Sequence, residues 1–229
     1  MEVLVLEHEP GAPAALLEDW AREREHSLRT LRVPELRRWP APGEAEVVVS
    51  LGSERSVHAS QDGWIAREIE FLRAAHDAEV PVLGICFGAQ ALAKALGGGV
   101  ARARQFEPEW TMLETKDPEL IPPGPWLRWH EDVFGVPPNA REIVRAGEVP
   151  LAFSSGASVG IQFHPEVGVE VVNAWIEDSR STLLEHEIDE RELRRHIELA
   201  ASGALERAED LFDRIARLWE RRGGHGRGA

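Results

Sequence analysis

The stretch Val80–Gln90, which reads VPVLGICFGAQ, constrains the fold of this chain more than any other. Its apolar start is typical of a strand that is buried on both faces of a sheet. A tight glycine-bounded turn follows at residues 84–88, and the pattern then predicts a helix over residues 89–96. A strand, a sharp turn and a helix in this order predict one unit of an α/β protein.

A cysteine lies at the apex of this turn. Gly-x-Cys-x-Gly between a strand and a helix is the cysteine form of a nucleophile elbow, in which Gly84 and Gly88 leave no room for side chains. The helix N-terminus behind Cys86 favours a thiolate, and the N–H of Phe87 points to where an oxyanion would form. The turn therefore predicts a nucleophilic cysteine. The alternative is a single buried cysteine that acts as a small hydrophobic residue.

The overall composition limits the class of protein. The chain has 229 residues, of which 43% are hydrophobic, and this is enough for one sizeable core. A formal net charge of -14 disfavours a nucleic-acid partner, and the single cysteine, which excludes an intrachain disulfide, fits a reducing compartment. The N-terminus lacks the basic start of a signal peptide, and no apolar run approaches the ~20 residues of a membrane span. We therefore expect a cytoplasmic protein with no membrane partner.

Strands and helices alternate in the first part of the chain. Apolar runs predict strands at Glu2–Glu7 and Glu46–Leu51, and Ser27–Val33 is a candidate for the strand between them. Helical spacing predicts helices over residues 13–25 and 62–76. This alternation predicts an α/β fold with a flavodoxin-like, mostly parallel sheet and helices on both faces.

The pattern changes after residue 99 to short strands between Pro and Gly turns, followed by a helix expected over residues 167–179. From Ile188 onward, apolar residues at helical spacing predict one or two amphipathic helices. We divide the chain into a domain of residues 1–182 and a helical extension with a frayed tail, residues 183–229. Packing of this extension on the sheet is favoured over an extension held out for a partner.

A cysteine nucleophile needs a base, and His164 is the first candidate. It follows an apolar run and precedes Pro165, so we expect it at the same carboxyl edge of the sheet as Cys86. Glu166 is placed to bond the far ring nitrogen of His164 and to fix its tautomer. Together these residues predict a Cys–His–Glu triad, in which the thiolate attacks and the histidine moves protons.

The other histidines have weaker contexts. His130 is the rival base, and we assign it to a loop wall of the pocket. His8, His58 and His76 show no metal-ligand spacing, so we expect surface or packing residues and no metal site. The short basic run at residues 102–104 is expected at a solvated strand edge.

The two motifs together make the sequence resemble the class I (triad-type) glutamine amidotransferases. GICFGAQ matches the nucleophile motif of that family, and FHPE at Phe163–Glu166 matches its His/Glu motif at the usual separation. The resemblance covers roughly residues 1–180. Within it, the stretch from EVVVSLGS to VPVLG is similar to the branch that includes the amidotransferase domain of GMP synthase.

The resemblance implies glutamine as the substrate and a defined set of site residues. Cys86 would attack the carboxamide, His164 would protonate the leaving ammonia and later activate water, and Glu166 would orient His164. The backbone N–H groups of Gly52 and Phe87 would form the oxyanion hole. The residues that the resemblance assigns to substrate binding are Gln90, His130 and Glu131.

Two segments depart from the family pattern. The loop at residues 51–54 reads Leu-Gly-Ser-Glu where the family usually has Gly-Gly-Pro, and this puts the shape of the loop and the fit of the substrate in question. Glu131 stands where the family has a small residue, so it narrows the pocket or changes what enters it.

The leading hypothesis is a glutaminase domain that supplies ammonia to a separate synthetase or acceptor enzyme. The sequence has no P-loop and no pyrophosphatase loop, so we expect neither a complete GMP synthase nor a cofactor. One alternative is a hydrolase of γ-glutamyl amides or peptides with the same triad. A second is a non-catalytic binding module on the same scaffold.

Overall fold

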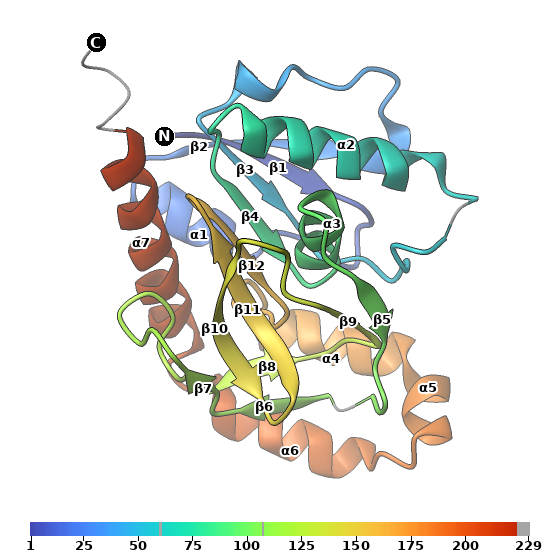
Figure 1. Cartoon of the computed structure of the whole chain (residues 1–229). Helices are drawn as coiled ribbons and strands as arrows, with labels where there is room; N and C mark the ends of the chain where they lie inside the picture. The colour runs from blue at the N-terminus through green and yellow to red at the C-terminus, as the bar shows by residue number, and fades with distance from the viewer. Residues whose placement is uncertain (60, 107, 224–229) are drawn as a thin grey trace.

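The computed structural model describes residues 1–59, 61–106 and 108–223, and a central sheet organises them (Figure 1). In order across this eight-stranded sheet, the strands are β2 (Ser27–Arg32), β1 (Glu2–Glu7), β3 (Val47–Ser50), β4 (Val82–Ile85), β12 (Ser158–Ile161), β11 (Val149–Ser155), β10 (Arg141–Ala146) and β7 (Glu114–Thr115). The first five run parallel, and the last three are added by antiparallel pairing. The predicted mostly parallel sheet is confirmed.

Helices cover both faces of the sheet, as predicted (Figure 1). Helices α1 (Leu16–Glu23) and α7 (Ala204–Gly223) pack on one face, and α2 (Gly63–Asp77) and α3 (Phe87–Ala95) pack on the other. The strands divide between the two cores with period two: in β3, the first and third valines face α1 and α7, whereas the second faces α2 and α3. Apolar residues on consecutive positions are therefore all buried.

The C-terminal helix α7 packs on the sheet and is not held out from it. Phe212 and Ile215 of α7 lie in the same core as Trp20 of α1, and the Trp20 indole donates to Asp213 at 2.8 Å. The favoured interpretation of this segment, packing on its own domain, agrees with these contacts. The domain boundary predicted between residues 182 and 183 falls inside helix α5 (Arg180–Glu185) and stays a prediction.

A smaller layer lies beyond the carboxyl edge of the parallel strands. It consists of α4 (Val169–Asp178), α5, α6 (Glu190–Ala201), the strand pair β6 (Glu109–Thr111) and β8 (Trp126–Arg128), and the nearby pair β5 (Val100–Arg102) and β9 (Asp132–Phe134). Two 3-10 turns, Val33–Glu35 and Pro42–Glu44, precede β3. The small layer has its own apolar core, to which α4, α5, α6 and β8 contribute Val172, Ile176, Leu183, Leu193, Ile197 and Leu127.

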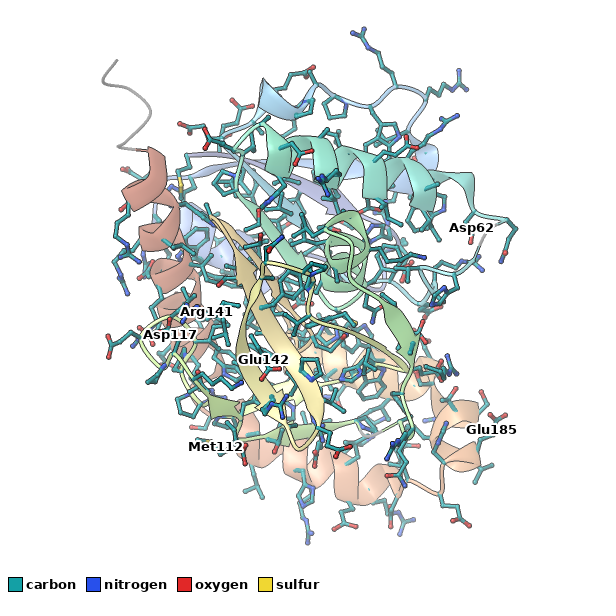
Figure 2. All side chains as sticks on the ribbon, in the orientation of Figure 1. Asp62, Met112, Asp117, Arg141, Glu142 and Glu185 are labelled. Atoms are coloured by element: carbon teal, nitrogen blue, oxygen red, sulfur yellow. The ribbon has the colours of Figure 1, made fainter. Side chains whose placement is uncertain are left out.

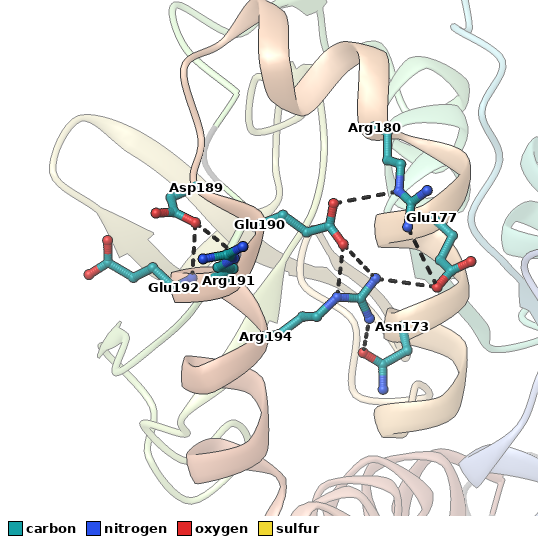
Figure 3. Close-up of polar contacts among 8 residues, drawn as sticks. All are labelled: Asn173, Glu177, Arg180, Asp189, Glu190, Arg191, Glu192 and Arg194. Atoms are coloured by element: carbon teal, nitrogen blue, oxygen red, sulfur yellow. Dashed lines mark hydrogen bonds and ion pairs between the residues drawn. The ribbon is translucent and has the colours of Figure 1, made fainter.

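A polar network locks α6 onto α4 (Figure 3). The Arg194 guanidinium donates to Asn173 of α4 at 2.7 Å and to Glu190 of its own helix at 3.0 Å. The Asp189 carboxylate caps α6 by accepting from the backbone N–H of Arg191 at 2.8 Å. Because these contacts fix α4, they also fix the side chains that α4 carries at the edge of the sheet.

An ion pair lies at the antiparallel edge of the sheet. Arg141, at the start of β10, donates to the Asp117 carboxylate at 2.7 Å, and Figure 2 shows both side chains beside α7. The bond from Arg141 lowers the pKa of Asp117, so the pair is charged at neutral pH. In the described part of the chain, no helix is both long and apolar enough to cross a membrane.

Candidate active site

Cys86 lies at the junction of β4 and α3, in a strained backbone conformation. Its φ of 52° and ψ of -109° are rarely adopted by an L-residue. A Cβ added at Gly84 would lie 2.5 Å from the Gly88 carbonyl oxygen, and one added at Gly88 would lie 2.1 Å from the Ser50 carbonyl oxygen. The expectation that this turn leaves no room for side chains at either glycine is confirmed.

His164 and Glu166 form a buried hydrogen-bonded pair. The chain passes from β12 into a short bridge in which the His164 N–H donates to the Leu127 carbonyl at 2.9 Å. His164 Nδ1 then lies 2.8 Å from Glu166 Oε1, with both side chains nearly inaccessible. The other ring nitrogen, Nε2, lies 3.2 Å from the Trp129 carbonyl oxygen, and Cys86 Sγ lies 3.8 Å from that same oxygen. Cysteine, histidine and carboxylate therefore meet, although Cys86 is far from the other two in sequence.

The environment of His164 favours its charged form. Burial acts to lower its pKa, but the Glu166 carboxylate and the Cys86 sulfur act in the opposite direction and outweigh it, so the pKa is raised well above its usual range. A protonated imidazole can donate from both ring nitrogens, and both face acceptors here. The arrangement provides a proton donor directly beside a thiol.

Gly52 and Phe87 adjoin the cysteine from two sides. Gly52 follows β3, and a Cβ at this residue would lie 3.3 Å from His164 Cε1 and 3.8 Å from Cys86 Cβ. Phe87 is the first residue of α3, so its N–H has no acceptor within the helix. Gly52 and Phe87 therefore both adjoin Cys86, and their role as oxyanion donors stays a prediction.

A cavity of about 330 Å³ opens above the sulfur. Gln90 lines it and donates from Nε2 to the Asp132 carbonyl oxygen at 2.9 Å. This bond holds the loop that carries His130 and Glu131. Glu131 also lines the cavity and pairs with Arg102 at 2.8 Å, at an exposed rim. All three residues assigned to substrate binding, Gln90, His130 and Glu131, therefore border one cavity with Cys86.

His130 differs from His164 in its charge state. The residue is partly exposed, but both of its ring nitrogens are buried and have no hydrogen-bond partner within the described residues. Burial, followed by the nearby charges of His164 and Arg128, lowers the pKa of His130 to about 3. His130 is therefore neutral at physiological pH and forms part of the cavity wall.

Some residues at the site were not predicted from the sequence. Trp175 of α4 packs its ring 4.9 Å from the ring of His164 and donates to the Gly11 carbonyl at 2.6 Å. Asp178 of α4 and Thr182 of α5 complete that wall of the cavity. The periodicity of α4 predicted the helix but carries no signal for which face meets the site.

Of the two roles predicted for His8, surface or packing, the structure shows the packing role, and it adds a polar partner that was not predicted. Its side chain is fully buried and forms an ion pair with the equally buried Glu68 of α2, with Nε2 2.9 Å from the carboxylate. A signal was present, because His8 directly follows the first buried strand. Among the described residues, no group of three or more His, Cys, Asp or Glu side chains is arranged to hold a metal ion.

Residues 45–179 match the family described as "Glutamine amidotransferase class-I". Two similar curated proteins are named GMP synthase [glutamine-hydrolyzing]. The protein from Aeropyrum pernix is 34% identical over 148 residues, which are 59% of this chain and 28% of that protein. The protein from Mycolicibacterium paratuberculosis is 38% identical over 118 residues, which are 46% of this chain and 22% of that protein. The matched regions thus span less than a third of these relatives.

A solved structure agrees over almost the whole chain. A glutamine amidotransferase from Thermotoga maritima superposes with a TM-score of 0.82 at 29% identity, covering 94% of this chain and 97% of that one. The likeness therefore includes the C-terminal helices, which lie beyond the residues matched by the family.

Proposed function

Because this chain belongs to the class-I glutamine amidotransferases, we propose that it hydrolyses the carboxamide of glutamine through Cys86, His164 and Glu166. The observation that supports the proposal is the chain of non-covalent contacts that links Glu166, His164 and Cys86 at the cavity floor. Glu166 holds one ring nitrogen of His164, and the other nitrogen faces the carbonyl group that also contacts the Cys86 sulfur.

The proposed reaction has two halves. In the first, the Cys86 thiolate attacks the carboxamide carbon, the carbon–nitrogen bond breaks, and His164 gives its proton to the leaving nitrogen, which departs as ammonia. In the second, His164 takes a proton from water, the hydroxide attacks the γ-glutamyl thioester, and the carbon–sulfur bond breaks to release glutamate. Gly52 and Phe87 N–H groups stabilise the oxyanion in both halves. Glutamine and water thus give glutamate and ammonia, with the thiolate and the imidazolium restored.

We also propose that the ammonia serves a separate synthetase or acceptor enzyme. Relatives with 34% and 38% identity are named GMP synthase, and in each of them the matched region is a minor part of the protein. No P-loop motif occurs within residues 1–229, so the proposal places ATP-dependent activation of the acceptor outside these residues.

A second candidate is hydrolysis of N-substituted γ-glutamyl amides. An aromatic wall favours it: the Trp129 ring lies 5.7 Å from the Trp175 ring and 5.6 Å from the Phe106 ring, and all three residues border the cavity. Such a wall suits an apolar amine leaving group.

One assay tests the triad and separates the two candidates. Purified protein is given glutamine and γ-glutamyl-p-nitroanilide in parallel, and glutamate release is measured. The glutaminase proposal expects a higher kcat/KM for glutamine, whereas a preference for the anilide supports the second candidate. Cys86→Ala should abolish both activities and leave the circular dichroism spectrum unchanged; retained turnover in this variant would remove Cys86 from the mechanism.

A further inference from the structure

A second histidine–carboxylate pair lies beneath the proposed oxyanion hole. His8 Nε2 is 3.1 and 2.9 Å from the two oxygens of Glu68, and neither side chain is exposed to solvent. The Ser50 hydroxyl donates to the same carboxylate at 2.7 Å. A buried carboxylate is costly unless it is paired and hydrogen-bonded, and both conditions are met here.

The remaining ring nitrogen of His8 reaches the active-site loop. Nδ1 lies 2.9 Å from the Gly52 carbonyl oxygen, which can only accept a hydrogen bond, so Nδ1 carries a proton. Nε2 faces a carboxylate and also carries a proton if Glu68 is ionised. Burial acts to lower the pKa of His8, but the charge and hydrogen bond of Glu68, the Gly52 carbonyl and the charge of Glu9 together outweigh it, so the pKa is raised. Both ring nitrogens of His8 therefore face acceptors.

This contact restrains Gly52, a glycine in the loop beside the cysteine. The Gly88 N–H donates to the Leu51 carbonyl at 3.0 Å, which fixes the peptide plane that also carries the Gly52 N–H. The bond from His8 fixes the next plane, between Gly52 and Ser53. Glycine has the widest conformational freedom of any residue, and the segment from Leu51 to Ser56 contains no proline to limit it. Both planes must be held for Gly52 to keep one conformation beside Cys86.

His8 also contacts the other side of the proposed oxyanion hole. Its ring packs edge-on against the Phe87 ring, with the centroids 4.8 Å apart, and it stacks on Trp64 at 5.2 Å. One side chain thus touches both residues whose N–H groups are proposed to bind the oxyanion. No protein acceptor faces the Gly52 N–H among the residues that the structure describes, so this donor is available to a ligand.

We propose that His8, bonded to the buried Glu68, is a positioning residue whose hydrogen bond to the Gly52 carbonyl holds Gly52 in the geometry needed to bind the oxyanion. The inference rests on the proposed function, because it gives Gly52 a role in that reaction. His8 and Glu68 do not touch the substrate carbonyl in this proposal. They act on transition-state stabilisation through the backbone, so their loss lowers kcat more than it changes KM.

The test compares two substitutions of His8 that differ in where they place a donor, both made with Glu68→Gln. The side-chain amide of His8→Asn lies near the former position of Nδ1 and can still bond the Gly52 carbonyl. The amide of His8→Gln lies near the former position of Nε2 and cannot. We expect His8→Asn to keep kcat within about threefold, and His8→Gln to lose about 10- to 100-fold in kcat with little change in KM, somewhat less than deletion of an oxyanion donor.

A matched control separates positioning from general stability. His76, which bonds the Ser158 hydroxyl at 3.0 Å away from the cavity, receives the same two substitutions. They should lower the melting temperature without a change in kcat. Equal kcat for the two His8 variants, whether high or low, would overturn the proposal. If the His8→Gln chain does not fold, His8→Met with Glu68→Leu replaces the pair by apolar groups and removes the donor, and the same loss in kcat is expected.

Amide hydrogen exchange keeps this inference separate from the proposed function. If the wild-type protein releases no glutamate from glutamine, the proposed function fails. The positioning of Gly52 is still measured, because exchange in the segment from Leu51 to Ser56 should be faster in the His8→Gln chain than in the wild type and unchanged in the His8→Asn chain. Identical exchange in all three chains would overturn the inference while leaving the glutaminase assay unaffected.

Discussion

At the elbow, replacement of the cysteine by glycine should give a more stable fold than replacement by alanine. Cys86 has a φ of 52° and a ψ of -109°, which lies outside even the small left-handed helical region open to other L-residues. Such a backbone costs a non-glycine residue about 1–3 kcal/mol. The structure holds it because Gly84 and Gly88 are packed against backbone on both sides of the turn. Only this turn presents the sulfur at the sheet edge.

The cleanest comparison is between Cys86→Ala and Cys86→Gly, because both lack the thiol and differ by one methyl group. We take the strain at about 2.5 kcal/mol, near the upper end of the range, because both dihedral angles are unfavourable. Relative to alanine, glycine destabilises the fold by about 0.7 kcal/mol through chain entropy and by about 0.8 kcal/mol through the lost burial of a methyl group. The Cys86→Gly chain should therefore be more stable than the Cys86→Ala chain by about 1 kcal/mol, which corresponds to a melting temperature higher by about 2–4 °C.

Differential scanning fluorimetry and urea unfolding measure this difference directly. Ala89→Gly, at the third residue of α3 and fully buried, is the control in which the same methyl group is lost from an ordinary helical backbone. It should destabilise the protein by about 1–2 kcal/mol. If Cys86→Gly lies below Cys86→Ala by a similar amount, the elbow is not strained and the reasoning fails.

Three further predictions concern packing, pH and the small layer. Gly88→Ala should cost about 3 kcal/mol or more in urea unfolding, since its Cβ would meet backbone at 2.1 Å, whereas Gly99→Ala, with nothing within 4 Å, should be neutral. His130 has a folded pKa of about 3 against a usual 6.5, so its contribution to stability is full above pH 6.5 and falls by up to about 1.4 kcal/mol per pH unit as the pH drops toward 3. In urea unfolding, the midpoint of His130→Asn should fall less between pH 6.5 and pH 3 than that of the wild type, whereas the midpoint of His196→Asn should fall as in the wild type. Arg194→Ala should lower stability by about 1 kcal/mol and raise KM for glutamine more than it lowers kcat, because it loosens the helix that walls the cavity.

Much of the sheet could be predicted because its information is local. The strand β1 was predicted with its bounds, and the strands around Ser27–Arg32 and Val47–Ser50 were predicted within one or two residues. In β1 and β3 the signal is a continuous apolar run, because both faces of these strands are covered, whereas the edge strand β2 is only partly buried. The elbow was predictable for a related reason. Glycines at both ends of a turn next to a buried strand leave few alternative backbone conformations for that turn.

The small layer was less predictable, because its position depends on contacts between distant segments. The helix α4 was expected near residues 167–179 and runs from Val169 to Asp178, but its packing on His164 depends on the ring of Trp175 and on the α6 network that anchors it. Helical periodicity gives an apolar face without saying what the face covers. The aromatic wall of the cavity therefore emerged only from the fold.

The two histidine–carboxylate pairs show where sequence reasoning stopped. In His164–Glu166 the partners are two residues apart, so the pair was predicted from one motif. In His8–Glu68 they are 60 residues apart, and Glu68 looks like an ordinary residue of an amphipathic helix. Yet the strand before His8 runs parallel to β3 and ends at the same edge. A polar residue directly after a buried parallel strand is delivered to the carboxyl edge wherever its partner lies in the sequence, and this rule places His8 beneath Gly52 without knowledge of Glu68.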